Sequence, residues 1–247
     1  MAQKKTFEQI LIKVMRDADI ILLLLDPRRV QSNPRIEQKI KERAKKFIYV
    51  VSKSDLVTRP VIAKIKSEMK DVVIVSATKH IGLNKLLARI MDTAHLMGKE
   101  KVTVGVVGFP NTGKSTLINS LKGHKSAGTS PISGYTKGVQ KLKINNQIMM
   151  LDTPGVLPHT KPKLEYVLIG AITPDKMKDP ESIACELITE LKGAIEEHFG
   201  VQIKEDAELT LEEIAFKKKL LLKGGEPDTR RIAEEIIRLV QRGAIKW

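Results

Sequence analysis

The chain has 247 residues, of which 42% are hydrophobic, and a formal net charge of +14, from 43 Lys and Arg against 29 Asp and Glu. This length and composition suffice for one or two domains with a buried core, which excludes wholesale disorder. A single cysteine excludes an internal disulfide and a cysteine-rich zinc site. No apolar run approaches the length of a membrane span, and the N-terminus shows no apolar signal core, so we expect a cytoplasmic protein.

The positive charge is unevenly distributed along the chain. Residues 161–247 contain 15 basic and 17 acidic groups, whereas residues 1–160 contain 28 basic and 12 acidic groups, a net charge of +16. The shift coincides with a stretch bracketed by Pro158 and Pro162. We therefore predict two domains, 1–160 and 161–247, and an anionic partner, for which nucleic acid is the first expectation.

Short apolar runs alternate with amphipathic stretches in the first 155 residues. The runs that predict strands are 19–25, 47–51, 72–75, 102–107, 138–144 and 147–151. The stretches that predict helices between them are 34–46, 60–70, 81–97 and 115–121. This alternation is typical of a parallel α/β sheet, and the last two runs, joined by Asn145-Asn146, read as a hairpin.

Beyond Lys163 the pattern becomes helical. We predict helices at 164–172, 180–199, 210–222 and 228–243. The predicted fold is therefore an α/β domain with a mostly parallel sheet, followed by a small all-α domain.

Gly108-Phe109-Pro110-Asn111-Thr112-Gly113-Lys114-Ser115 fits the phosphate-binding loop (P-loop) pattern. A predicted strand precedes it and a predicted helix follows, which is the context that the motif requires. Glycines let the backbone N–H groups surround phosphates, the lysine supplies positive charge to the β- and γ-phosphates, and the serine is placed for Mg²⁺. The residues expected to bind the nucleotide here are Asn111, Thr112, Gly113, Lys114, Ser115 and Thr116.

Asp152-Thr153-Pro154-Gly155 follows the last predicted strand. An acidic residue at a strand end beside a P-loop suits a Mg²⁺ site, and the Gly155 N–H can contact the γ-phosphate. We predict that Asp152 and Ser115 help to hold Mg²⁺.

Two further motifs follow earlier strands. In Ser52-Lys53-Ser54-Asp55, the Asp55 carboxylate can accept two hydrogen bonds from a guanine edge while the Lys53 stem packs on the base. Ser76-Ala77-Thr78 can offer a backbone N–H to the guanine carbonyl. Either motif alone is as compatible with a solvated turn. Together with the P-loop they predict one nucleotide site, because ligands of open α/β sheets bind beyond the carboxyl ends of the strands.

This set of motifs resembles the guanine-nucleotide-binding domain of small and translation-type GTPases. The base-reading motifs at 52 and 76 precede the P-loop at 108, which is the reverse of the ordinary order. In this the chain resembles the circularly permuted GTPases, and within them the YlqF/RbgA family of ribosome-assembly GTPases. Asp26-Pro27-Arg28-Arg29-Val30 stands where that family has an Asp-Ala-Arg-x-Pro motif, and residues 220–225 resemble its C-terminal helical domain.

The resemblance implies further roles. Residues 133–138 resemble the family's switch motif, in which Thr136 would bind Mg²⁺. Ser52 replaces the usual asparagine, which braces the loop, so guanine preference is retained with weaker binding. Asn111 matches an asparagine that ligates K⁺ in related GTPases, and Val156 replaces the water-orienting glutamine of Ras-like proteins. We assign the catalytic contributions to Lys114, Asn111, Thr136 and Gly155, with hydrolysis slow until a ribosomal partner stimulates it.

The leading interpretation is a Mg²⁺- and K⁺-dependent GTPase that hydrolyses GTP to GDP and phosphate and acts as a switch in large ribosomal subunit assembly. Its partners would be rRNA and a large-subunit precursor, with no membrane or DNA partner, and it would be a monomer off the ribosome. For Arg28 and Arg29 we favour bracing of their loop over contact with RNA. Two alternatives remain open: a P-loop ATPase or kinase, and an RNA-binding scaffold with a structural nucleotide.

Overall fold

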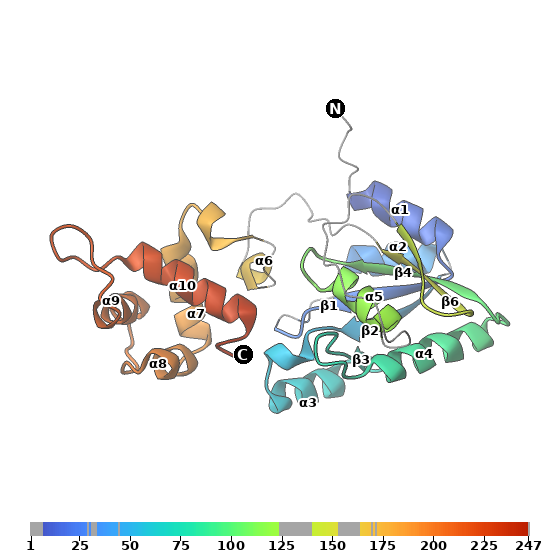
Figure 1. Cartoon of the computed structure of the whole chain (residues 1–247), viewed down its shortest axis with the longest axis horizontal. Coiled ribbons are helices and arrows are strands. Elements are labelled where there is room, and N and C mark those ends of the chain that lie inside the picture. Colours follow the sequence, from blue (N-terminus) through green and yellow to red (C-terminus); the bar gives the residue numbers. More distant parts are fainter. Residues whose placement is uncertain are drawn as a thin grey trace. The chain divides into compact units, whose positions relative to one another are not determined.

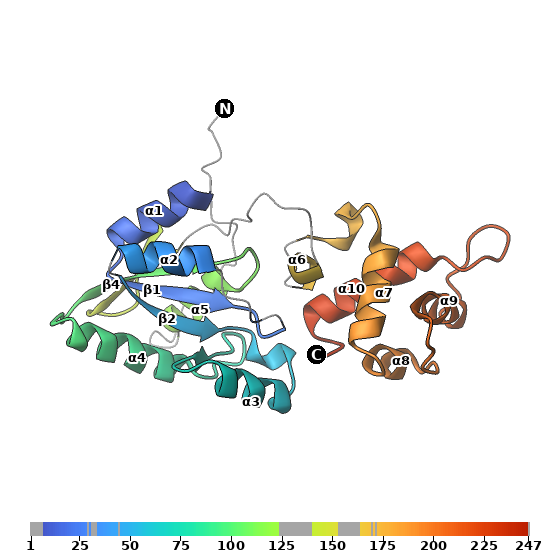
Figure 2. The ribbon, with the colours of Figure 1, turned by 180° about the vertical axis from the view of Figure 1, so that it is seen from behind.

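A computed structural model of the chain describes residues 7–28, 30, 34–43, 45–123, 140–152, 164–168, 170 and 172–246. The chain divides into two compact units: the first comprises residues 1–55 and 59–160 and contains the sheet, and the second comprises residues 161–247, with the helices that follow the sheet, together with residues 56–58. Figures 1 and 2 show the two units from opposite sides. No helix in these described ranges is long and apolar enough to cross a membrane.

The first unit is built on a six-stranded sheet with the order β3-β2-β1-β4-β6-β5. All neighbouring strands are parallel except β5 and β6, which form an antiparallel pair. The strands are β1 (Ile20–Leu25), β2 (Lys46–Val51), β3 (Val73–Ile74), β4 (Val102–Gly108), β5 (Gln140–Lys143) and β6 (Ile148–Asp152). The predicted α/β class with a mostly parallel sheet is confirmed.

Helices cover both faces of this sheet, as Figures 1 and 2 show. They are α1 (Phe7–Asp17), α2 (Pro34–Glu42), α3 (Arg59–Glu68), α4 (Leu83–Leu96) and α5 (Lys114–Gly123). On one face α4 and α5 pack against Leu22 and Leu24 of β1, and on the other α1 and α2 pack against Ile21 and Leu23. Successive side chains of a strand point to opposite faces, so the uniformly apolar β1 is buried on both sides.

Helix α1 is missing from the sequence-based prediction, although Leu11, Val14 and Met15 have helical spacing and are buried. It approaches β4 so closely that a Cβ at Gly105 would lie 2.4 Å from Val14 Cγ1. Glycine at 105 is therefore what lets this helix pack against the sheet.

Several helices and strands have boundaries that differ from the predicted ones. The helix predicted to reach Lys46 ends at Glu42, and β3 is shorter than the apolar run that predicted it. The predicted hairpin is present as β5 and β6, and the Asn145 side-chain oxygen accepts from the N–H groups of Gln147 and Ile148, both at 2.8 Å. This side-chain bonding pattern is a common device for closing a tight turn.

The second unit is helical, as predicted. Its helices are α6 (Leu164–Leu168), α7 (Pro180–Glu190), α8 (Ala194–Phe199), α9 (Ala207–Lys217) and α10 (Thr229–Arg242). They surround a core to which α7, α9 and α10 contribute Leu187, Ile214 and Ile236. The single helix predicted at 180–199 is instead two helices, α7 and α8. The break lies just before Ala194, at Gly193, which has φ 93°.

Side chains end and connect these helices. Asp228 caps α10 by accepting from the Arg231 N–H at 3.1 Å. The helix predicted at 210–222 ends earlier, at Lys217, and Gly224 and Gly225, seven and eight residues further on, lie in a turn with positive φ. Gln241 of α10 donates to the carbonyl of Val167, at 2.7 Å, and so attaches α6 to the core.

Candidate nucleotide-binding site

Five parallel strands end at the same edge of the sheet, and the motifs found in the sequence follow four of them. Ser52 follows β2, Ser76 follows β3, the P-loop follows β4, and Asp152 ends β6. A fifth loop, beginning with Asp26, follows the central strand β1. The topology therefore brings segments up to 126 residues apart in sequence, Asp26 and Asp152, to one edge, where open α/β sheets bind their ligands.

The P-loop joins β4 to α5 in a conformation set by a few residues. A Cβ at Gly108 would lie 2.9 Å from the Leu24 carbonyl oxygen, so this position excludes any larger residue. Asn111 and Gly113 have φ values of 58° and 86°, in the left-handed region that asparagine and glycine tolerate best. The Thr112 hydroxyl donates to the Phe109 carbonyl at 2.8 Å. Such a loop at a helix N-terminus is suited to binding an anion.

Lys114 lies at the first turn of α5 and only 6% of it is exposed. Its ammonium donates to the carbonyls of Gly108, at 3.0 Å, and Phe109, at 2.7 Å. Burial lowers the pKa of Lys114 to about 8, against the opposing influence of the Asp152 carboxylate. Because the buried cation is poorly solvated, an anionic phosphate at this loop would relieve an existing electrostatic cost.

The predicted Mg²⁺ ligands are divided between described and undescribed residues. Asp152 is buried at the end of β6, and its charge acts on Lys114 of the P-loop, next to Ser115. A carboxylate and a hydroxyl are hard oxygen donors, which fit Mg²⁺. The described ranges contain no cluster of three or more His, Cys, Asp or Glu that could hold a metal. Thr136 and Gly155 lie outside the described residues, as does Val156.

The loop after β2 contacts the P-loop. Ser52 is buried, with its hydroxyl 2.7 Å from the Thr112 carbonyl oxygen and 3.1 Å from that of Leu25. Since a hydroxyl has one hydrogen, it serves one of these acceptors at a time. Lys53 has φ 49°, and its Cε lies 3.9 Å from where a Cβ on Gly113 would be. Ser52 thus connects the end of β1 to the P-loop.

The two base-reading motifs are joined by hydrogen bonds. The Ser76 hydroxyl donates to Asp55 Oδ1 at 2.5 Å, lies 3.3 Å from the Thr78 hydroxyl, and accepts from the Lys79 N–H. Asp55 is partly exposed in a 3₁₀ turn, Ser54–Leu56. Ser76 thus fixes the orientation of the carboxylate that would read the base.

Ser120 is a positioning residue that sequence reasoning missed. From α5 its hydroxyl donates to the Ala77 carbonyl at 3.0 Å, so it holds the loop after β3 against the helix that begins at the P-loop. No local pattern could have identified it, because its partner lies 43 residues earlier in the chain.

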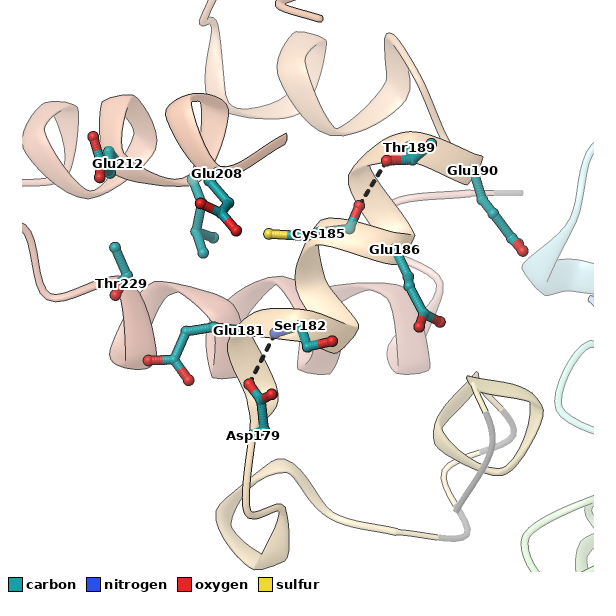
Figure 3. A pocket seen from close by; sticks show the side chains of 11 residues that line it. Asp179, Glu181, Ser182, Cys185, Glu186, Thr189, Glu190, Glu208, Glu212 and Thr229 are labelled. Atoms are coloured by element: carbon teal, nitrogen blue, oxygen red, sulfur yellow. Dashed lines mark hydrogen bonds between the residues drawn. The ribbon is translucent and has the colours of Figure 1, made fainter. Parts of the chain in front are cut away.

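A separate hollow lies in the helical unit. It has a volume of about 740 Å³, and Figure 3 shows the side chains around it, from the start of α7 to the start of α10. Its lining includes six carboxylates and no Lys or Arg; they are Asp179, Glu181, Glu186, Glu190, Glu208 and Glu212. This negative charge would repel phosphate, so the hollow does not suit a nucleotide or RNA.

A P-loop at the carboxyl edge of a parallel sheet, beside loops that can read a guanine, defines the class of guanine-nucleotide-binding P-loop proteins. The motifs run in permuted order, because β1, β2 and β3 and their loops precede the P-loop strand and are connected to it through α4.

Comparisons with known proteins agree with this assignment to the guanine-nucleotide-binding proteins. Residues 103–212 match a family model described as 50S ribosome-binding GTPase. The chain is 36% identical over 252 residues to an uncharacterized GTP-binding protein of Methanocaldococcus jannaschii. The alignment covers 99% of this chain and 67% of that protein. It is 32% identical over 258 residues to nucleolar GTP-binding protein 2 of Yarrowia lipolytica, covering 99% of this chain and 51% of that one. The chain thus spans about half the length of its nucleolar relative.

Among solved structures, GNP-bound YlqF from T. maritima matches with a TM-score of 0.63 at 23% identity, over 96% of this chain and 94% of that one. The GDP-bound form of the same protein matches with the same TM-score. At this identity the likeness establishes the fold. The relative from Methanocaldococcus jannaschii shows that the chain belongs to a family of GTP-binding proteins, and its fold is that of the circularly permuted YlqF, as the motif order predicted.

Proposed function

We propose that the chain hydrolyses GTP to GDP and phosphate and acts as a switch in assembly of the large ribosomal subunit. The observation that carries the proposal is the junction of base-reading and phosphate-binding loops at one sheet edge, through Lys53 beside Gly113 and Ser76 on Asp55. The names of the similar proteins, a ribosome-binding GTPase family and nucleolar GTP-binding proteins, support the ribosomal role.

In the proposed site, the P-loop residues 111–116 bind the phosphates and Lys114 bears the charge that matches them. Asp55, oriented by Ser76, accepts from the guanine edge, and the loop at 76–78 contributes a backbone donor. Ser115, Asp152 and Thr136 would hold Mg²⁺, which when bound would neutralise phosphate charge. Gly155 would contact the γ-phosphate.

Hydrolysis is proposed to be slow until a ribosomal partner stimulates it. Val156 stands where a glutamine orients water in Ras-like proteins, and its side chain cannot hydrogen-bond. A group from outside the chain would then be needed to place the attacking water.

We expect K⁺ to accelerate turnover relative to Na⁺ by about tenfold, through the Asn111 amide oxygen. A K⁺ ion there would supply positive charge beside the β- and γ-phosphates. The variant Asn111→Gly keeps the left-handed backbone, since φ is 58°, and removes the ligand. Phosphate release measured in matched K⁺ and Na⁺ buffers should then show no difference for this variant. Equal turnover of the wild-type chain in the two salts would refute the role of Asn111.

The RNA contacts are proposed to come from both units. The sheet unit carries a net charge of +16, whereas the helical unit has a net charge of −2. In the helical unit, Lys218 pairs with Glu235 at 3.1 Å and Arg238 with Glu234 at 2.9 Å, so these cations are partly neutralised. Lys219, Lys223, Arg231 and Arg242 are exposed and are the better candidates for contacts with phosphates.

Cosedimentation with large-subunit precursors tests the whole proposal. Association should be stronger with GTP than with GDP or without nucleotide, and should weaken as salt is raised. Association that is indifferent to the nucleotide would favour the RNA-binding scaffold instead. Competition between GTP and ATP for binding to the isolated chain tests the ATPase alternative. A preference for GTP would exclude that alternative, and a preference for ATP would support it.

A further inference from the structure

A buried ion pair lies at the carboxyl end of the central strand β1, beside the nucleotide loops. Asp26 and Arg28 are 2% and 3% exposed. The Arg28 guanidinium donates from Nε to Asp26 Oδ1 at 2.8 Å and from Nη2 to Oδ2 at 2.7 Å. The Arg28 N–H also donates to Asp26 Oδ1, at 3.2 Å. This two-pronged geometry fixes the plane of the carboxylate.

Asp26 also faces the base-reading loop. Lys53 Nζ lies 3.5 Å from Asp26 Oδ2, the oxygen that already accepts from Arg28. The Lys53 stem in turn reaches the P-loop, where its Cε lies 3.9 Å from the position that a Cβ on Gly113 would take. A continuous series of contacts therefore runs from the loop after β1, through the loop after β2, to the loop after β4.

Stability alone does not account for this arrangement. Burying an ion pair costs desolvation that its attraction often only offsets, so an apolar pair of similar size would stabilise the fold at least as well. Two cations share one carboxylate here, and the Asp26 carboxylate is the group that keeps Arg28 and Lys53 side by side. Burial lowers the pKa of Lys53 and the Arg28 charge adds to this, whereas Asp26 opposes both.

We propose that Asp26, oriented by Arg28, is a positioning residue for guanine-nucleotide binding: it holds Lys53 against Gly113 and so ties the base-reading loop to the phosphate-binding loop. The inference rests on the proposed nucleotide site. It assigns Asp26 no contact with the nucleotide; its effect passes through Lys53.

A double-mutant cycle on GDP binding tests this route. Asp26→Asn keeps the side-chain shape and removes the charge, and we expect it to raise the Kd for GDP about tenfold. In a Lys53→Met background the same change should have little further effect, because the residue through which Asp26 acts is gone. A defect that only loosened the fold would instead add to the Lys53→Met defect.

Two variants guard against misinterpretation. Asp26→Asn alone removes the carboxylate charge that faces the buried Arg28 guanidinium, so the pair Asp26→Asn/Arg28→Gln, which removes both charges, is measured as well and should raise the Kd to a similar degree. The matched control is Asp19→Asn, just before β1 at its opposite end, where the carboxylate binds Lys99 and the Thr103 N–H. It should leave the Kd unchanged.

The outcomes separate the inference from the function on which it rests. If the wild-type chain fails to bind GDP, the proposed site itself is wrong. If the wild-type chain binds GDP and Asp26→Asn binds it equally well, the positioning role is wrong and the site stands. Equal fold-changes for Asp26→Asn with Lys53 and with Met at position 53 would also overturn the route through Lys53.

Discussion

Replacing Lys114 with methionine should abolish tight GTP binding and at the same time stabilise the nucleotide-free protein. The lysine would make charge-assisted hydrogen bonds to the β- and γ-phosphates, and losing them costs about 3 to 5 kcal/mol, a factor of about 150 to 4,000 in Kd. Turnover should fall to background with it. Isothermal titration with GTP and GDP measures the first effect.

The gain in stability follows from the lowered pKa of Lys114. This pKa is about 8 in the folded chain and about 10.4 in an unfolded one, so between these values the unfolded state binds more protons. The charged lysine therefore destabilises the fold by up to about 3 kcal/mol below pH 8, and this cost disappears as the pH rises towards about 10.4. Hydrogen bonds from Lys114 to the Gly108 and Phe109 carbonyls offset part of the cost.

Urea unfolding should accordingly show Lys114→Met more stable than the wild-type chain by about 1 to 2 kcal/mol at pH 7, with the advantage lost near pH 10. The control is Lys122→Met, an exposed lysine on the same helix, which should change neither stability nor binding appreciably. A destabilised Lys114→Met at neutral pH would contradict the electrostatic interpretation of this residue.

Asp55→Asn should transfer the preference of the site from guanine to xanthine nucleotides. A carboxylate accepts from both the ring N–H and the amino group of guanine, whereas an amide can accept from the ring and donate to the carbonyl of xanthine. Losing a bidentate, charge-assisted pair costs about 3 kcal/mol or more, so the Kd for GDP should rise at least about a hundredfold. The Ser76 hydroxyl can still donate to the amide oxygen, so the loop keeps its orientation.

Competition between GDP and xanthosine diphosphate for the same protein measures the transfer. Asp71→Asn is the matched control: this aspartate pairs with Arg89 on the surface, and its φ of 62° suits asparagine equally well. The control should bind both nucleotides as the wild-type chain does. If Asp55→Asn kept its preference for GDP over the xanthine nucleotide, Asp55 would not be the residue that reads the base.

The local parts of the site could be predicted from the sequence. The P-loop is a contiguous segment whose shape depends on its own residues, with Asn111 and Gly113 at positive φ. The sequence also predicted that Asp55 and Ser76 lie at the same edge of the sheet, because each follows an apolar run and parallel strands end at a common edge. The order of these motifs indicated the permuted family, which the relative from Methanocaldococcus jannaschii and the fold bear out.

Prediction failed where long-range packing decides the outcome. Helix α1 was missed, and its fit against β4 depends on Gly105, about 90 residues later in the chain. The long helix predicted at 180–199 is two helices, because packing of α7 and α8 into one core favours a break at Gly193 over a continuous rod. Ser120 could not be recognised, since its partner Ala77 belongs to another loop.

The sequence by itself determined which residues can bind phosphates and read a base, and in which order they occur, because these properties reside in short contiguous motifs. Only the tertiary structure decided which of these residues meet: it buried Asp26 with Arg28, placed Lys53 between that pair and the P-loop, and lowered the pKa of Lys114. Burial and the distance between charges are properties of the packed chain, and they set the electrostatics on which the proposed site depends.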